Sequence, residues 1–199
     1  MRQKLKCLTR LRTPGIPLLS AYLEASCCIS RNLQQHYHRN GWLERIGFGA
    51  YVWPGDELDW QGVLHSLQVQ LGAPVHIGAR TALSFAGYAH YIRTEGEEIF
   101  LFSKHKRELP RWVSKQPCCR NLSLHHTGFL TDDDLGLTNA PYKTFEMRVS
   151  SPERAILETL YLSPRSVGYA EAYQLTENLA TLRPTILQGL LENCNSVIG

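Results

Sequence analysis

Apolar residues recur at helical spacing in the first forty residues of the chain. Leucines at positions 5, 8 and 11 form one stripe between lysines and arginines, which predicts an amphipathic helix over 2–11. The Thr-Pro-Gly run at 13–15 ends that helix. We expect a second short helix over 16–24 and a third over 28–39, with Ser26 as the N-cap of the third.

The third helix separates an apolar side from a polar side. With about 100° per residue, Leu33 and Tyr37 stay on the side of Ile29. Arginine can hydrogen-bond guanine and glutamine can hydrogen-bond adenine at base edges, so a polar arc opposite is a candidate DNA-reading face, although any surface helix has a solvated face. This arc contains no acidic residue and consists of Arg31, Gln34, Gln35 and His38. Arg39 lies at its margin, where it suits a phosphate contact.

A β-hairpin is predicted directly after this helix. Its strands are expected at 42–46 and 50–53, with Gly47 and Gly49 beside Phe48 at the tip, where a tight connection requires positive φ angles. Two roles are open for Phe48: insertion toward a minor groove, or covering the apolar base of the hairpin. Three helices followed by such a hairpin predict a winged helix-turn-helix domain over 1–55, whose third helix enters a major groove.

Charge is distributed unevenly along the chain. Residues 1–55 carry eight Lys/Arg against two Asp/Glu, a net charge of +6, whereas residues 56–199 carry thirteen against sixteen, a net charge of −3. This asymmetry indicates that the N-terminal part meets a polyanion, and we expect double-stranded DNA as that partner. The residues expected to hold its phosphates are Arg39, Arg45 and, in the first helix, Lys4 and Lys6.

Residues 56–199 are predicted to form a second domain in which helices and strands are mixed. The acidic run 56–59 marks the boundary. Helices are expected at 60–71, 81–91, from 152, at 168–179 and at 184–193, and strands from 75, at 98–103, 122–126 and 144–149. The fold class predicted for the whole chain is α+β, a winged helix-turn-helix followed by a mixed α/β domain.

Composition excludes several classes of protein. Hydrophobic residues make up 43% and charged residues 20% of the 199 residues, which is typical of a globular chain, and no apolar run is long enough for a transmembrane helix. No apolar core with a cleavage site follows the basic N-terminus, so we expect a cytoplasmic protein without membrane association. The six cysteines include two adjacent pairs and no C-x-x-C motif, which favours reduced, mostly buried thiols.

One catalytic alternative lies in the second domain. Asp134 is followed on the next predicted strand by Glu146 and Arg148, which resembles the Asp and Glu-x-Lys layout of metal-dependent nucleases. Arg148 stands where that layout has its catalytic lysine, and it cannot release its proton. The two histidines within each of the pairs 36/38 and 125/126 point in different directions, so we expect no metal site. We also expect no cofactor and no catalytic residue. A nuclease that uses Asp134 and Glu146 is kept as the alternative.

Three stretches carry a family resemblance. They are GWLERIGFGAYVWPGD (41–56), PVHIGARTALSFAGYAHYI (74–92) and VSSPERAILETLYLSP (149–164). The first resembles the end of the N-terminal winged-helix domain of the AbiEi antitoxin family, from type IV toxin–antitoxin systems. The other two resemble segments of that family's C-terminal domain, and the resemblance covers nearly the whole chain in register.

This resemblance implies an N-terminal domain that binds inverted repeats in its own promoter and represses its operon. It implies a C-terminal domain, over 56–199, that counteracts a cognate nucleotidyltransferase toxin encoded next to it. Family members usually continue well past position 193, so the resemblance also implies that C-terminal elements are truncated or absent in these 199 residues. We therefore expect a DNA-binding repressor and antitoxin, and not an enzyme.

Overall fold

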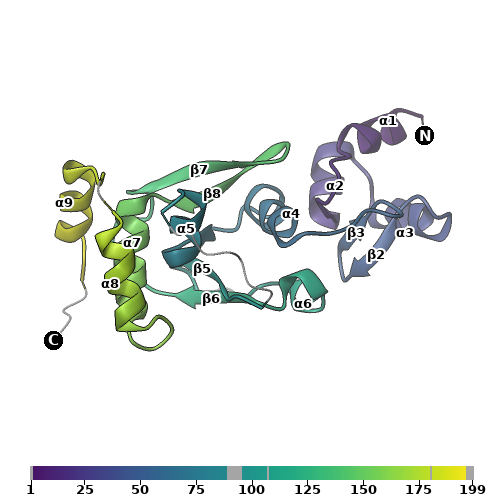
Figure 1. Ribbon diagram of the computed structural model, residues 1–199. Coiled ribbons are helices and arrows are strands. Elements are labelled where there is room, and N and C mark those ends of the chain that lie inside the picture. The colour runs from purple at the N-terminus through teal and green to yellow at the C-terminus, as the bar shows by residue number, and fades with distance from the viewer. Residues whose placement is uncertain (1, 89–95, 107, 180, 196–199) are drawn as a thin grey trace. The chain divides into compact units, whose positions relative to one another are not determined.

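The computed structural model describes residues 2–88, 96–106, 108–179 and 181–195 (Figure 1). Helices and strands occur in runs rather than in strict alternation, and both sheets contain antiparallel pairs, so the fold class is α+β. The chain forms two compact units. Unit 1 comprises residues 1–73, 109–120 and 142–145, and unit 2 comprises residues 74–108, 121–141 and 146–199. The domain boundary expected at residues 55 and 56 lies inside unit 1.

Unit 1 begins with helix α1 (Arg2–Arg10), whose apolar stripe faces the core as the leucine spacing predicts. The next element is a short strand, β1 (Leu18–Leu19), and helix α2 covers Ser20–Cys27. The helix expected over 16–24 is therefore shifted toward the C-terminus. The buried leucines of β1 pair with another strand, and this pairing overrides the helical periodicity of the segment.

Helix α2 ends at a left-handed residue that sequence reasoning placed inside the third helix. Cys28 has φ 50°, its N–H donates to the Glu24 carbonyl, and the N–H of Ile29 donates to the Leu23 carbonyl. The bond from Cys28 to Glu24 is the 5→1 bond of the αL motif, which closes a helix with a left-handed residue and satisfies one of its last carbonyls. Ser26 lies inside α2, so the prediction that it caps the third helix is wrong.

Helix α3 covers Arg31–Arg39 instead of 28–39, with Ser30 at its N-cap position. The hairpin follows, made of β2 (Glu44–Gly47) and β3 (Ala50–Val52). Strand β3 also pairs antiparallel with β1, giving a three-stranded sheet in the order β1-β3-β2. The hairpin was predicted from its glycines, whereas the third strand was not.

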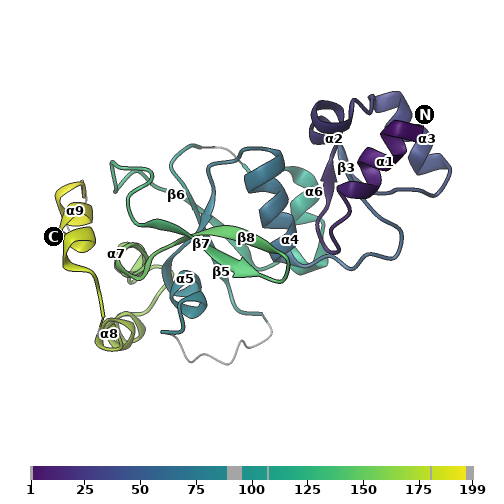
Figure 2. The same cartoon turned by 90° about the horizontal axis from the view of Figure 1, so that it is seen from above.

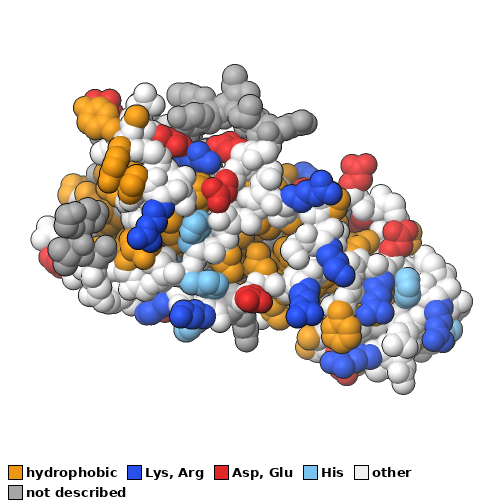
Figure 3. Space-filling model, turned by 90° about the horizontal axis from the view of Figure 1, so that it is seen from below, with side chains coloured by type: hydrophobic (Ala, Val, Ile, Leu, Met, Phe, Trp, Pro, Cys, Tyr) orange, Lys and Arg blue, Asp and Glu red, His pale blue; other side chains and the backbone are white. Residues whose placement is uncertain are grey.

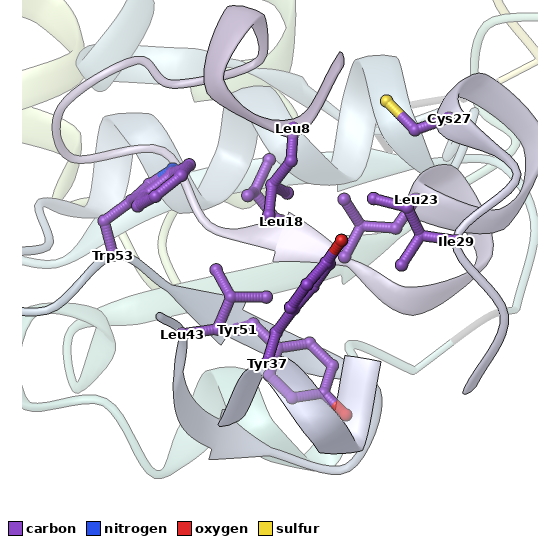
Figure 4. Close-up of a cluster of buried hydrophobic side chains, with 9 residues drawn as sticks. All are labelled: Leu8, Leu18, Leu23, Cys27, Ile29, Tyr37, Leu43, Tyr51 and Trp53. Atoms are coloured by element: carbon purple, nitrogen blue, oxygen red, sulfur yellow. The ribbon is translucent and has the colours of Figure 1, made fainter. Parts of the chain in front are cut away.

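The core of this part joins all three helices to the sheet. Figure 4 shows the ring of Tyr37, from α3, directed toward Leu18 of β1 and Leu23 of α2. Leu8 of α1 and Leu43, just before β2, are fully buried in the same cluster. Burial of such side chains stabilises the fold by about 1.5–3 kcal/mol each. The core therefore fixes which face of α3 points outward.

Two further segments complete unit 1. Helix α4 (Trp60–His65) starts at Asp59, whose carboxylate accepts from the Gly62 N–H at 2.7 Å, and continues as the π-helix η1 (Ser66–Gln70). The Gln70 carboxamide accepts from the Leu19 N–H at 2.8 Å and donates to the Pro17 carbonyl at 2.8 Å. These bonds tie η1 to the edge of β1, which explains why the compact unit extends to residue 73.

The second segment comes from far along the chain and was not predicted. It consists of α6 (Arg111–Ser114) and the 3-10 helix η2 (Pro117–Cys119). A Cβ on Gly47 would lie 2.3 Å from the Cβ of Trp112, so only glycine permits this close packing of α6 on the hairpin. The Gln116 side chain also donates to the Ile46 carbonyl at 3.3 Å. The hairpin is therefore supported by α6.

Unit 2 contains a five-stranded sheet in the order β6-β5-β4-β8-β7. Its central strand β4 pairs antiparallel with β5 and parallel with β8, and β5 pairs parallel with β6, so the sheet is mixed. The strands are β4 (His76–Ile77), β5 (Ile99–Ser103), β6 (Leu122–His126), β7 (Leu137–Tyr142) and β8 (Phe145–Ser150). Strand β7 was missed, because its alternating polar residues and Pro141 resemble a loop.

Four helices complete unit 2: α5 (Ala79–Phe85), α7 (Pro152–Leu162), α8 (Tyr169–Glu177) and α9 (Pro184–Glu192). Helix α7 packs against the other three. Figures 1 and 2 show α7, α8 and α9 together at one end of the unit. All four were predicted: the starts of α7 at Pro152 and of α9 at Pro184 are confirmed, α5 and α8 have shifted ends, and α9 ends one residue earlier than expected. Residues 89–91 of the helix expected over 81–91 lie outside the described residues.

The expectation that all six thiols are reduced is wrong in this structure. Cys7 of α1 and Cys27 of α2 form a disulfide with a Cα–Cα distance of 5.7 Å. Cys27 belongs to one of the two adjacent pairs, but its disulfide partner is Cys7, 20 positions earlier, and the two come together because α1 packs on α2. Among the other cysteines, Cys28 is exposed and Cys119 is buried.

The part of the chain that the structure describes contains no helix both long and apolar enough to cross a bilayer.

Candidate nucleic-acid interface

The outward face of α3 is rotated from the one that the helical wheel predicted. That wheel took Ile29 as a helical position, but Ile29 precedes the helix and packs in the core from the turn. The buried residues of α3 itself are Gln34 and Tyr37. At about 100° per residue, the side opposite them is centred on Asn32 and Arg39, with Gln35 and His36 on either side, and it does not include Gln34.

Gln34 is fully buried, so the prediction that it reads a base is wrong. Its carboxamide donates to the carbonyls of Ser20 at 3.0 Å and Ile29 at 2.8 Å, and its oxygen accepts from the Ser20 hydroxyl at 2.5 Å. Ser20 begins α2 and Ile29 lies in the turn before α3. Gln34 therefore holds the two helices and their connecting turn together, because buried polar groups require such partners.

The exposed residues of α3 form a surface without an acidic side chain. They are Arg31, Asn32, Gln35, His36, His38 and Arg39. Arg31, Gln35 and Arg39 are spaced four apart and lie on one stripe, with Asn32 and His36 beside it. Asn32 and His36 were not predicted, because the misplaced wheel put both on the side of Ile29. We call these six residues the α3 face.

His38 is exposed, but one of its ring nitrogens is occupied. Its Nδ1 lies 3.0 Å from the Leu43 carbonyl oxygen. A carbonyl only accepts, so Nδ1 carries the proton and the Nε2 of the neutral ring is an acceptor. His38 can therefore accept from an amino group of cytosine or adenine, and it also ties the end of α3 to the hairpin.

The hairpin carries one exposed cation and one exposed aromatic ring. Arg45 of β2 donates through Nε to the Gly47 carbonyl at 3.1 Å, and its guanidinium lies 5.9 Å from the centre of the Phe48 ring. Phe48 is 84% exposed. Covering the base of the hairpin is therefore not its role in this structure, and Arg45 is held along the hairpin toward its tip.

The two lysines predicted to hold phosphates lie on α1. Lys6 is exposed and Lys4 is half-buried. The Cys7–Cys27 disulfide fastens this helix to α2 next to them. Both lysines are thus on an element fixed to the same core as α3.

Three cations that sequence reasoning missed belong to unit 1. The segment 109–120, which packs on the hairpin through Trp112, has no acidic residue and exposes Arg111, Lys115 and Arg120. With them, unit 1 has twelve Lys/Arg against five Asp/Glu, a net charge of +7, and unit 2 has nine against thirteen, a net charge of −4. Figure 3 shows Lys and Arg side chains gathered on the part of the surface formed by unit 1.

The carboxylates of the nuclease alternative do not form a metal-binding group. Asp134 makes an ion pair with Arg148, and Glu146 is exposed on β8. No group of three or more His, Cys, Asp or Glu side chains suited to a metal ion occurs within the described residues. The structure therefore gives this alternative no support.

Two family models match the chain. One, described as "Transcriptional regulator, AbiEi antitoxin N-terminal domain", matches residues 1–94, and the other, described as "Transcriptional regulator, AbiEi antitoxin, Type IV TA system", matches residues 96–198. No curated protein matches the sequence.

A solved structure also has a similar fold. It is the crystal structure of the RV2827C protein from Mycobacterium tuberculosis, whose sequence is 16% identical to this one. The superposition covers 97% of this chain and 71% of that chain, with a TM-score of 0.61. At this identity the likeness concerns the fold alone. The family models confirm the resemblance carried by residues 41–56, 74–92 and 149–164. The chain therefore belongs to the AbiEi antitoxin family of transcriptional regulators from type IV toxin–antitoxin systems.

Proposed function

We propose that unit 1 binds double-stranded DNA as a winged helix-turn-helix, with α3 in the major groove. Helices α2 and α3 are joined by the three residues Cys28, Ile29 and Ser30, a turn length typical of helix-turn-helix motifs. The hairpin β2–β3 follows α3 directly and takes the place of the wing. The exposed α3 face supplies hydrogen-bond donors and acceptors and contains no acidic side chain.

Base contacts are assigned to the stripe on the α3 face. Arg31 lies in the first turn of α3, and N-terminal residues of a recognition helix are the ones that reach base edges. Arg31 suits guanine, Gln35 suits adenine, and His38 offers an acceptor through Nε2. Asn32 has the same bidentate chemistry toward adenine as Gln35.

Phosphate contacts are assigned to the cations that surround this face. They are Arg39 at the C-terminal end of α3, Arg45 on the hairpin, Lys4 and Lys6 on α1, and Arg111 and Lys115 beside the hairpin. Such contacts fix the orientation of the protein on the duplex but carry no sequence information. We assign to Phe48, which is exposed at the hairpin tip, an approach to the minor groove.

The DNA that we propose is the promoter of the protein's own operon, read as inverted repeats, so that the protein represses its own synthesis. We propose further that the C-terminal part counteracts a nucleotidyltransferase toxin encoded next to it. The family supports both roles, since its models describe a transcriptional regulator and a type IV antitoxin. The observation that carries the DNA-binding proposal is the acid-free α3 face within a unit of net charge +7.

DNA binding is tested by gel shift with a duplex from upstream of the gene and an unrelated duplex of the same length. We expect a shift at low salt with preference for the upstream duplex. Replacing Gln35 with Ala removes one bidentate contact and is expected to reduce that preference by about 1–3 kcal/mol. Absence of any shift at low salt would overturn the proposal.

The antitoxin role is tested by co-expression with the neighbouring gene product. We expect the neighbour to arrest growth alone and to be harmless in the presence of this chain. A variant with both Arg31 and Gln35 replaced by Ala is expected to keep the antitoxin effect, because those residues serve DNA. A neighbour that remains toxic in the presence of the folded wild-type chain contradicts the role.

A further inference from the structure

A buried carboxylate connects four elements of unit 2. Glu158 of α7 is 1% exposed. Its Oε2 accepts from the Ala79 N–H at 3.0 Å and the Ser150 hydroxyl at 2.8 Å. Its Oε1 accepts from Arg154 Nε at 3.0 Å and lies 2.9 Å from His76 Nε2. A Cβ on Gly78 would lie 2.3 Å from Oε2, so a glycine is required there for this approach.

Burial raises the pKa of Glu158, but the neighbouring His76 and Arg154 and the hydrogen bonds outweigh it and leave the pKa below its ordinary value. The carboxylate is therefore charged, and its four donors satisfy it. Because His76 and Arg154 both contact the same oxygen, their side chains are held next to each other. Each side chain is only 8% exposed.

Each of these two side chains keeps one nitrogen unused. Arg154 uses Nε for Glu158 and Nη1 for the carbonyls of Asp132, Asp133 and Leu135, so Nη2 has no partner within the described chain. His76 uses Nε2 for Glu158, and its Nδ1 likewise has no hydrogen-bond partner among the residues described. Neither nitrogen is among the fully buried side-chain atoms that lack a hydrogen-bond partner in the described residues, so both keep some contact with solvent.

Both side chains line a pocket of about 230 Å³ within unit 2. Lys104 and Arg148 line it as well, each paired with an exposed aspartate: Lys104 with Asp133 at 2.9 Å, and Arg148 with Asp134. Asp133 is 53% exposed and Asp134 is 83% exposed, so both carboxylates can turn to solvent. The pocket thus has a fixed inner wall that contains the Arg154 guanidinium and the His76 ring, and a mouth whose cations have replaceable counterions.

We propose that this pocket binds a small molecule through a carboxylate or phosphate group. The oxyanion accepts from Arg154 Nη2 and from His76 Nδ1, which takes up a proton from solvent when the anion binds, because Nε2–H already donates to the Glu158 carboxylate. The oxyanion also replaces Asp133 and Asp134 as the partner of Lys104 and Arg148. Guanidinium groups match the geometry of both oxyanions. The volume exceeds that of a few waters and is below that of a drug-sized site, which suits a small organic acid or phosphate ester.

The oxyanion proposal is independent of DNA binding, because every residue in it belongs to unit 2. It is tested on the full chain labelled with 15N at histidine, by recording the ring nitrogens while inorganic phosphate or, in a separate arm, acetate is added. Sodium chloride holds the ionic strength constant. The His76 signals are assigned by their loss in His76→Gln. We expect a saturable shift at His76 in at least one arm, and the arm that saturates at lower concentration identifies the oxyanion.

Two variants make the test specific. Lys104→Ala alters an exposed side chain at the mouth and is expected to weaken binding about threefold, the size of one surface charge pair. Arg165→Ala removes an exposed arginine outside the pocket and is expected to leave the binding curve unchanged. No saturable shift at His76 with either anion overturns the proposal, as does equal weakening by the two variants.

Discussion

The Ser20 hydroxyl donates to the side-chain oxygen of Gln34 at 2.5 Å, joining the first residue of α2 to the middle of α3. Gln34 returns a hydrogen bond to the Ser20 carbonyl at 3.0 Å. This reciprocal pair fixes the angle between two helices that are separated by only three residues. A residue that sequence reasoning assigned to DNA thus serves the scaffold that presents its neighbours.

Gln34 and Gln35 provide a matched pair for separating stability from DNA binding. Gln34→Ala removes the partner of the buried Ile29 carbonyl and of the partly buried Ser20 hydroxyl and carbonyl, and we expect the free energy of unfolding to fall by about 1–3 kcal/mol. Gln35→Ala alters an exposed position and is expected to change it by less than about 0.5 kcal/mol. Denaturant unfolding measures both. Equal stability of the two variants would contradict the buried role of Gln34.

Gly47→Ala tests the packing of α6 on the hairpin. The added methyl would lie 2.3 Å from the Cβ of Trp112, so the two segments must move apart. We expect a loss of about 1–3 kcal/mol in the free energy of unfolding, the usual cost of overpacking. Gly128→Ala is the control, because a Cβ there meets nothing within 4 Å. The contact is refuted if Gly47→Ala unfolds at the same denaturant concentration as Gly128→Ala.

The disulfide between Cys7 and Cys27 spans 20 positions of sequence. Closing a loop of this size restricts the unfolded chain, and Cys7→Ser is expected to lower the free energy of unfolding by about 3 kcal/mol under oxidising conditions. Cys28→Ser, at the exposed neighbouring thiol, is expected to have little effect. If a reducing agent lowers the stability of wild type and Cys7→Ser equally, the bond does not contribute.

The ion pair between Glu153 and Arg183 makes the stability of unit 2 depend on pH. Burial raises the pKa of Glu153, but hydrogen bonds from the Arg183 side chain and backbone outweigh this effect and lower the pKa to about 2. A depressed pKa stabilises the fold above the unfolded value of about 4.5, and this contribution disappears as pH falls toward 2.

We expect the pair to contribute about 1–2 kcal/mol above pH 4.5, less than the full shift implies because Arg183 is 59% exposed and screened by solvent. Unfolding measured between pH 5 and pH 2 should show this loss in wild type. In Arg183→Ala the part of this acid dependence due to the Arg183 side chain should be absent, while the hydrogen bond from the backbone N–H of residue 183 remains. An unchanged profile in the variant would contradict the assignment.

The local signals in the sequence predicted most elements but not how they come together. Gly47 and Gly49 indicated the hairpin, and leucine spacing indicated α1. Ile29 misled the helical wheel, because a left-handed Cys28 cannot be distinguished from a helical residue by periodicity. Contacts over long separations had no local signal at all: Arg111 and Lys115 lie about sixty positions after the hairpin that their segment supports.

The exposure of a candidate site residue could be predicted where a single helix or hairpin determines it, and not where a distant element does. Arg31, Gln35, His38, Arg39 and Arg45 are exposed as required, since one helix and one hairpin decide their direction. Gln34 is buried because its partners come from Ser20, on another helix. The polar network around Glu158 joins residues 76, 79, 150 and 154, and no spacing in the sequence connects the first two with the others.

Salt dependence of binding to upstream DNA tests the central claim most directly. Fluorescence anisotropy at several salt concentrations gives the slope of log K against log salt, which is about −0.9 for each phosphate neutralised. We predict a steep negative slope for wild type, reduced by about 1 in Arg45→Ala and in Arg111→Ala. The slope should not change in Arg165→Ala, outside unit 1. A wild-type affinity independent of salt, or slopes equal in all variants, would contradict DNA binding by the basic surface of unit 1.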